Sequence, residues 1–134
     1  MSPETFERLA SALAQVPGLL CAWLFGSSAR GQASPDSDVD VAILFRDPPG
    51  FEAVGSALAA CQDTLRRDDV DVVVLNTAST ILAFEALSGR RLFTFAPQET
   101  AAFESLVARE YEDESARLTR ASAYPGVTES PPAT

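Results

Sequence analysis

Two aspartates at the start of an apolar segment constrain this chain more than any other feature. Residues 39–45, VDVAILF, are apolar except for Asp40, and Asp38 stands directly before them. Such a run of branched and aromatic residues predicts a strand within a sheet. Side chains alternate between the two faces of a strand, so Asp38 and Asp40 share one face, with their stems about 6.6 Å apart. The opposite face, which begins at Val39, is the expected core face.

Two ionised carboxylates this close repel each other, by about 3 kcal/mol at about 5 Å and an effective dielectric of about 20. A divalent cation removes that repulsion, and oxygen donors suit a hard cation such as magnesium. The alternative interpretation is a turn and a solvent-facing strand edge, with Asp36, Asp38 and Asp40 serving no ligand. For the Asp-Val-Asp motif alone this alternative is favoured, because short motifs often arise by chance.

A glycine–serine turn precedes the aspartates and follows another apolar run, LLCAWLF, at residues 19–25. Gly26 allows the backbone to turn sharply or to approach a ligand closely. Ser27 and Ser28 offer hydroxyl and N–H groups, which hold phosphate oxygens where lysine is absent. The alternative is a plain turn with a capping serine.

Three further charged residues bear on the same site. Arg30 would pair either with phosphate or, equally, with Asp36 or Asp38 as a structural salt bridge. Asp71 begins another apolar strand, VDVVVLN, and would join the first two acids if the two strands were neighbours. Asp69 has the same facing as Asp71 and is the rival third acid.

The rest of the chain alternates helices and strands. A serine cap followed by proline at residues 2–3 predicts a first helix that ends at residues 17–18. Further elements are expected over 51–67 (helix), 70–76 (strand), from Ser79 or Thr80 to Gly89 (helix), 90–95 (edge strand) and 97–121 (helix). This order predicts an α/β domain, with helices packed on a small sheet. Residues 122–134 are rich in Pro, Ser and Thr, and we expect a flexible tail there.

Composition excludes several classes of protein. The chain of 134 residues suits one domain, and it has neither lysine nor histidine, so a Ser-His-Asp triad and a Walker A loop are excluded. The net charge of −9 argues against direct nucleic-acid binding and suits a basic partner or solubility. No segment predicts a membrane span or a signal peptide, so we expect a cytoplasmic protein. Cys21 and Cys61 are expected to be buried thiols.

The glycine–serine pair at residues 26–27, ten intervening residues and Asp-Val-Asp at 38–40 resemble the signature of DNA polymerase β-like nucleotidyltransferases. The stretch GSSARGQASPDSDVDVAIL is similar to the minimal nucleotidyltransferase branch in particular, with Val41 replacing a commoner leucine. The resemblance implies a nucleotidyltransferase fold, a small mixed sheet flanked by helices, over residues 1–121.

Carried over to this sequence, the resemblance implies two groups of site residues. The nucleotide-binding group is Gly26, Ser27, Ser28 and Arg30. The catalytic and magnesium-binding group is Asp38, Asp40 and Asp71. The third acid would also help to position or deprotonate the attacking hydroxyl.

Proteins similar to this one are antitoxins encoded beside HEPN-domain toxin ribonucleases, and they transfer AMP from ATP to a tyrosine hydroxyl of the toxin. The resemblance therefore implies a magnesium-dependent protein adenylyltransferase with a HEPN toxin as partner, and it allows a hetero-oligomer of the two. Two alternatives stay open: an antitoxin that neutralises by occlusion with an idle active site, and transfer to a small molecule such as an aminoglycoside. The intact acids argue against the first, and the short chain argues against the second.

Overall fold

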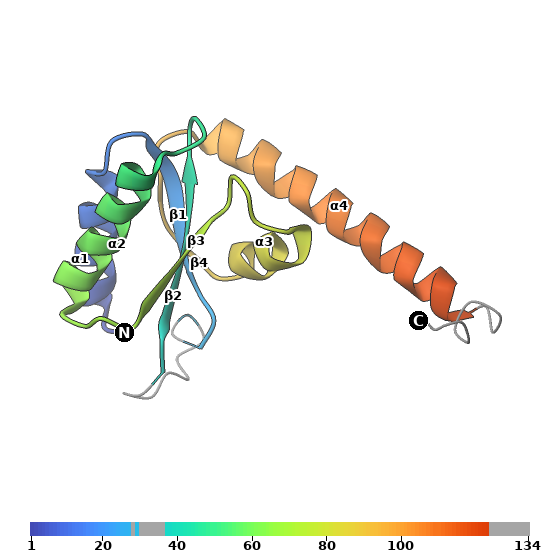
Figure 1. Cartoon of the computed structure of the whole chain (residues 1–134), viewed down its shortest axis with the longest axis horizontal. Helices are drawn as coiled ribbons and strands as arrows, with labels where there is room; N and C mark the ends of the chain where they lie inside the picture. The colour runs from blue at the N-terminus through green and yellow to red at the C-terminus, as the bar shows by residue number, and fades with distance from the viewer. Residues whose placement is uncertain (28, 30–36, 124–134) are drawn as a thin grey trace.

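The computed structural model describes residues 1–27, 29 and 37–123, the last three as backbone only. Ser28, Arg30 and Asp36 lie outside the described residues, as do residues 124–134 of the tail expected at 122–134. The chain forms three layers, with a sheet between two pairs of helices (Figure 1). The expected α/β class is therefore confirmed.

The sheet has four strands in the order β3-β2-β1-β4. Their bounds are β1 Leu19–Phe25, β2 Val39–Phe45, β3 Val70–Val74 and β4 Arg90–Thr94. Strand β1 is antiparallel to both β2 and β4, whereas β2 is parallel to β3. The sheet is therefore mixed, and β4 is the edge strand that the sequence predicts.

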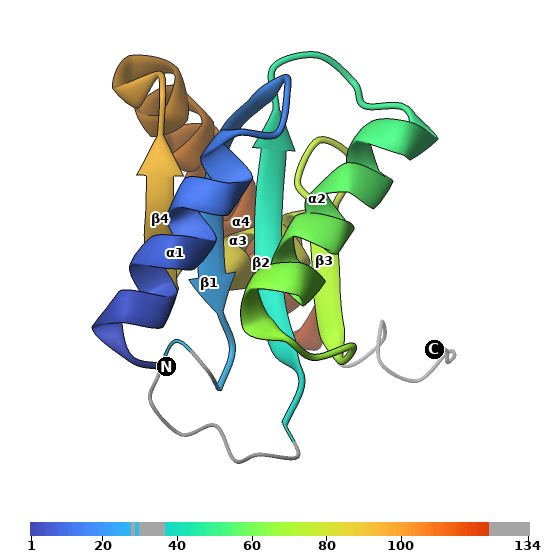
Figure 2. The same cartoon turned by 90° about the vertical axis from the view of Figure 1, so that its left-hand side faces the viewer.

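Two helices cover each face of the sheet, as Figure 2 shows with α1 and α2 in front and α3 and α4 behind. Their bounds are α1 Pro3–Ala14, α2 Phe51–Leu65, α3 Thr80–Leu87 and α4 Pro97–Ala123. Helix α4 packs mainly against α3 and extends beyond the sheet (Figure 1). Its last turn runs two residues past the expected end at 121.

Both faces of β2 are buried, which corrects the expectation of a single core face. Val41 and Ile43 lie in the core under α1 and α2, and Ala42 and Leu44 lie in a second core under α3 and α4. Ala42 is fully buried and Leu44 is 7% exposed. Asp40 thus lies on the face that α3 and α4 cover, near the start of β2, where it is only partly buried.

Two of the helices begin at side-chain caps, and one ends at a residue in a left-handed conformation. The hydroxyl of Ser2 accepts a hydrogen bond from the Thr5 N–H, as expected of the first cap. The hydroxyl of Ser79 accepts one from the Leu82 N–H, so Ser79 is the cap of α3. Helix α2 ends at Leu65, two residues earlier than expected, because the next residue takes a left-handed conformation with φ of 55°.

The third strand ends at Val74 and not at Asn76 as expected. The side chain of Asn76 takes the place of the strand backbone there: its Oδ1 accepts from the Phe45 N–H and its Nδ2 donates to the Phe45 carbonyl, both at 2.9 Å. A side-chain amide carries a carbonyl acceptor and N–H donors, so it can replace the acceptor and the donor of a peptide group. The hydrogen-bonded edge of β2 is therefore continued by a side chain.

Both cysteines are free and buried, as expected. Burial raises the pKa of the Cys61 thiol to about 12, so this thiol stays protonated at neutral pH. In the described part of the chain, none of the helices combines the length and the apolar composition that crossing a membrane requires.

Candidate active site

The candidate active site lies at one edge of the sheet, where three strand ends meet. Because β1 runs antiparallel to β2, and β3 runs parallel to β2, the end of β1 and the starts of β2 and β3 lie at the same edge of the sheet. This is the lower edge of the sheet in Figure 2. Gly26 follows β1, Asp40 stands second in β2 and Asp71 stands second in β3.

Two of the three predicted acids face each other directly. Asp40 pairs with Asp71 in the parallel register of β2 and β3, and neighbouring strands lie about 4.8 Å apart. The residues that flank the two acids, including Val39 and Val70, belong to the core under α2. Both acids therefore lie on the other face, towards α3, and the exposed Asp38 precedes Asp40 by two residues on the same face.

The carboxylates repel one another in this arrangement. Partial burial raises the pKa of Asp40, and the negative charges of Asp71, Asp38 and Glu85 raise it further. A nearby cation would reverse these charge effects, since opposite charge favours the ionised form. The three acids thus bring together negative charges that they cannot neutralise for one another.

Gly26 is required at its position for two reasons. Its φ of +73° is a conformation that side chains other than glycine rarely adopt. A Cβ there would also collide with Oδ2 of Asp40 and lie 3.4 Å from its Cγ. Gly26 therefore lies in direct contact with the side chain of Asp40.

The rival third acid, Asp69, is engaged elsewhere. Nε and Nη2 of Arg67 each donate to one oxygen of the Asp69 carboxylate at 2.5 Å. These hydrogen bonds lower the pKa of Asp69. Asp69 precedes β3, whereas Asp71 lies within it and opposite Asp40. The structure therefore favours Asp71 as the third acid by position.

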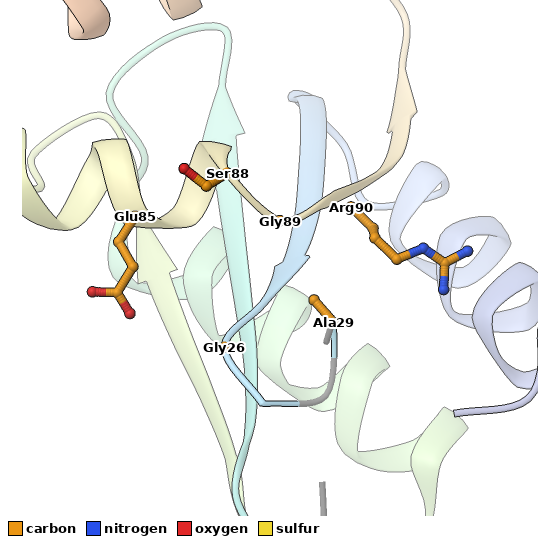
Figure 3. Close-up of a pocket in the computed structure, with 6 residues that line it drawn as sticks. All are labelled: Gly26, Ala29, Glu85, Ser88, Gly89 and Arg90. Atoms are coloured by element: carbon orange, nitrogen blue, oxygen red, sulfur yellow. The ribbon is translucent and has the colours of Figure 1, made fainter. Parts of the chain in front are cut away.

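A cavity of about 240 Å³ adjoins the glycine–serine turn (Figure 3). It is lined by Gly26, Ala29, Glu85, Ser88, Gly89 and Arg90. Figure 3 shows the Arg90 side chain extending towards α1 and the Glu85 carboxylate on the other side of the cavity. The Arg90 guanidinium lies over the Phe6 ring, 4.1 Å from its centroid, which holds the arginine in place.

The sequence does not predict four of the residues that line the cavity: Glu85, Ser88, Gly89 and Arg90. They join the site because β4 pairs with β1, which places the turn after α3 beside Gly26. Gly89 is the one residue of the four whose type points to this contact. A Cβ there would collide with the Leu24 carbonyl oxygen and lie 2.8 Å from Cβ of Phe25. A glycine at a tight contact marks a close approach of two backbones.

The chemistry of the acids suits a divalent cation, because three carboxylates supply only oxygen donors. Within the described residues, no three acidic or sulfur-bearing side chains are already gathered into a metal cluster. Ser27 is half-buried beside the cavity residues, and the two other predicted nucleotide-binding residues, Ser28 and Arg30, lie outside the described residues. The site thus offers an acidic half at β2 and β3 and a cavity half at β1 and β4.

Comparison with solved structures finds the same architecture. A toxin–antitoxin crystal structure with AMP-PNP matches with a TM-score of 0.72 and 26% identity, over 86% of this chain and 93% of that chain. A tri-AMPylated Shewanella oneidensis HEPN toxin in complex with MNT antitoxin matches with a TM-score of 0.69 and 24% identity, over 90% of this chain and 94% of that chain. The second likeness supports the fold.

Comparison of sequences identifies the family. The protein adenylyltransferase MntA of Shewanella oneidensis is 34% identical in an alignment of 82 residues, and the match covers 58% of this chain and 56% of MntA. The match thus spans little more than half the length of that relative. Residues 7–97 match the family described as "Polymerase beta, Nucleotidyltransferase", and this span contains the three acids, Gly26 and the whole cavity lining. The chain therefore belongs to the polymerase beta nucleotidyltransferase family.

Proposed function

We propose that this chain is a magnesium-dependent antitoxin that transfers AMP from ATP to a tyrosine hydroxyl of a cognate HEPN toxin. The observation that carries the proposal is the pairing of Asp40 with Asp71, with Gly26 in contact with Asp40. A relative with 34% identity is named a protein adenylyltransferase. A relative with 26% identity is a toxin–antitoxin structure with AMP-PNP, which supports an ATP-like donor.

In the proposed reaction the tyrosine oxygen forms a bond to the α-phosphorus, the bond to the bridging oxygen breaks, and pyrophosphate leaves. Asp38, Asp40 and Asp71 would hold Mg²⁺. When bound, Mg²⁺ stabilises negative charge on the attacking and leaving oxygens. Asp71 lies on the strand farther from Gly26, so its carboxylate would position the attacking hydroxyl or take its proton. Histidine and lysine are not needed for this chemistry.

The cavity would hold part of the nucleotide. Its volume of about 240 Å³ is too small for a whole ATP and sufficient for one portion of it. Gly26 and Ser27 would present backbone N–H groups to the phosphates. Arg90 brings a positive charge to the same cavity, with its orientation fixed by Phe6. Ser28 and Arg30 are proposed to complete the grip from the same loop.

The net charge of −9 supports a partner with a basic surface, because complementary charge speeds encounter and disfavours wrong partners. A HEPN toxin would be that partner, bound in a hetero-oligomer long enough for transfer. Since the reaction consumes ATP, we expect it to take place in the cytoplasm.

The test is to incubate the protein with ATP, Mg²⁺ and the product of the neighbouring gene, and to measure the intact mass of that product. We expect mass gains of AMP that map to tyrosine. Asp40→Asn and Asp71→Asn should abolish the gain, whereas Asp63→Asn, which changes an exposed acid on α2, should not.

Two outcomes would contradict the proposal. If the mass does not change and Asp40→Asn neutralises the toxin as well as the wild type does, the protein acts by occlusion. If AMP appears on an aminoglycoside and not on the toxin, the acceptor is a small molecule.

A further inference from the structure

One arginine side chain connects the beginnings of the two strands that carry the acids. Arg67 donates two hydrogen bonds to the carboxylate of Asp69. Its Nη2 also donates to the backbone carbonyl of Ser37 at 2.5 Å. Ser37 directly precedes Asp38, and Asp69 stands two residues before Asp71. The guanidinium therefore lies between the chain segments that lead into both halves of the acidic site.

The backbone reinforces this connection. The Val39 N–H donates to the carbonyl of Asp69 at 3.0 Å, which joins the same two segments two residues after Ser37. Arg67 itself is anchored at the end of α2, since its N–H donates to the Gln62 carbonyl at 3.3 Å. The end of α2, the start of β2 and the start of β3 thus converge on Arg67.

The geometry of the contact suits arginine and not lysine. A guanidinium presents several N–H groups in a fixed plane, so it can hold a carboxylate with two of them and still donate to a third acceptor. Lysine is a single flexible point charge and does not fix the two segments in the same way.

The ion pair is partly exposed, with side-chain exposures of 28% for Arg67 and 39% for Asp69. Pairs at this level of exposure contribute little to global stability. Loss of the contact should therefore change the position of the neighbouring Asp38, which is exposed, more than it changes the stability of the fold.

We propose that Arg67 and Asp69 are positioning residues of the active site, which fix Ser37 and through it the carboxylate of Asp38 relative to Asp71. This inference rests on the proposed metal-dependent nucleotidyl transfer. It also gives Asp69 a role other than that of the third acid. Asp69 would act through Arg67 and would not touch the metal or the substrate.

The test compares Arg67→Met, Arg67→Lys and Asp69→Asn with Arg66→Met, which removes the same charge from the exposed neighbouring residue. Mn²⁺ serves as a probe for the metal, and electron paramagnetic resonance measures its affinity without turnover. We expect Arg67→Met to weaken Mn²⁺ binding and to lower kcat for AMP transfer, each by about 10- to 100-fold. The unfolding temperature should stay within a few degrees of that of the wild type.

Two comparisons separate positioning from a general structural role. Arg67→Lys should fail to restore Mn²⁺ affinity although it keeps the charge. Arg67→Met combined with Asp69→Asn should be no worse than Arg67→Met alone, because both changes break one contact. If Arg67→Met does not fold, Arg67→Lys and Asp69→Asn carry the same comparison with less disturbance.

The inference is overturned if Arg67→Met matches Arg66→Met in both Mn²⁺ affinity and kcat, or if the wild type binds no Mn²⁺. Failure of the proposed function looks different. In that case the wild type transfers no AMP to any acceptor, and the Mn²⁺ affinities still decide whether Arg67 organises the acids.

Discussion

At the residue scale, the surroundings of Asp40 disfavour the ionised form of its carboxyl group. Burial and three neighbouring carboxylates raise its pKa. The folded state therefore binds the proton of Asp40 more tightly than the unfolded chain does. The contribution of Asp40 to stability is most favourable below its ordinary pKa. It is lost as the pH rises through the interval between that value and the raised value of the folded state.

We expect Asp40→Asn to stabilise the metal-free protein at about pH 7 by on the order of 1 kcal/mol, because it removes one of several like charges at a partly exposed site. The gain should shrink at about pH 3, where the wild-type carboxyl is itself protonated. Thermal unfolding at the two pH values measures both effects. Asp63→Asn is the control, and a loss of stability in Asp40→Asn at both pH values would contradict this account.

Gly26 gives the second prediction at this scale. An alanine there would adopt a strained positive φ and push its Cβ against the Asp40 carboxylate. We expect Gly26→Ala to lower the free energy of unfolding by about 1–2 kcal/mol and to reduce AMP transfer by about 100-fold or more. Chemical denaturation and the mass assay measure the two effects.

Gly55→Ala is the matched control for Gly26→Ala. It places the same methyl group in open space on α2, and it should raise stability by up to about 1 kcal/mol. Equal behaviour of the two variants would show that the close approach of Gly26 to Asp40 has no consequence for the fold or the site.

At the scale of elements, the sequence predicts the strands well and their partners less well. The bounds of β1 and β2 agree with the sequence because each apolar run ends at glycine or at a charged residue. The expected end of β3 is wrong because the side chain of Asn76 replaces a backbone contact. No local sequence pattern predicts that a side chain will replace the strand backbone in this way.

The acidic half of the site was predictable, and the cavity half was not. The position of Asp71 follows from strand alternation once β2 and β3 are neighbours. The side of the cavity formed by residues 85–90, here called the 85–90 wall, depends on the pairing of β4 with β1. This is a contact between segments far apart in the sequence. Hydrophobic periodicity reports which face of an element is buried and does not report which strand lies beside it.

The turn between α3 and β4 supplies a prediction about that wall. Gly89→Ala would force the turn away from β1, because its Cβ would meet the backbone of Leu24 and Phe25. We expect a loss of about 1–3 kcal/mol in stability. We also expect the KM for ATP to rise more than kcat falls, since the turn lines the cavity and the acids stay in place. Ser88→Ala is the control for a change in the same turn without a new clash.

At the scale of the whole molecule, the site and the longest helix are separated. The acids lie at one edge of the sheet, whereas α4 leaves the sheet and packs mainly on α3 (Figure 1). The Phe84 and Tyr111 rings, 3.9 Å apart and almost parallel, join these two helices. We therefore expect changes in the outer part of α4 not to reach the three acids through direct packing.

A ligand that binds the folded protein raises its stability, and this gives a prediction for the molecule as a whole. We expect Mg²⁺ and ATP together, at about 100 times their dissociation constant, to stabilise the protein by about 2.7 kcal/mol. A shift of the thermal unfolding temperature measures the effect. Asp71→Asn should abolish most of it, and an unchanged temperature in the wild type would contradict an ATP site.

The parallel register of β2 and β3 has a consequence for folding itself. A slip of one residue turns every side chain of a strand to its other face. It would move Asp71 from the edge of the α3 side to the apolar layer beneath α2, among neighbours such as Val41 and Cys61. A carboxylate buried there without a partner costs several kcal/mol. The acid proposed for catalysis thus also makes the wrong alignment of the sheet unstable, so that a chain which folds stably has its acids aligned.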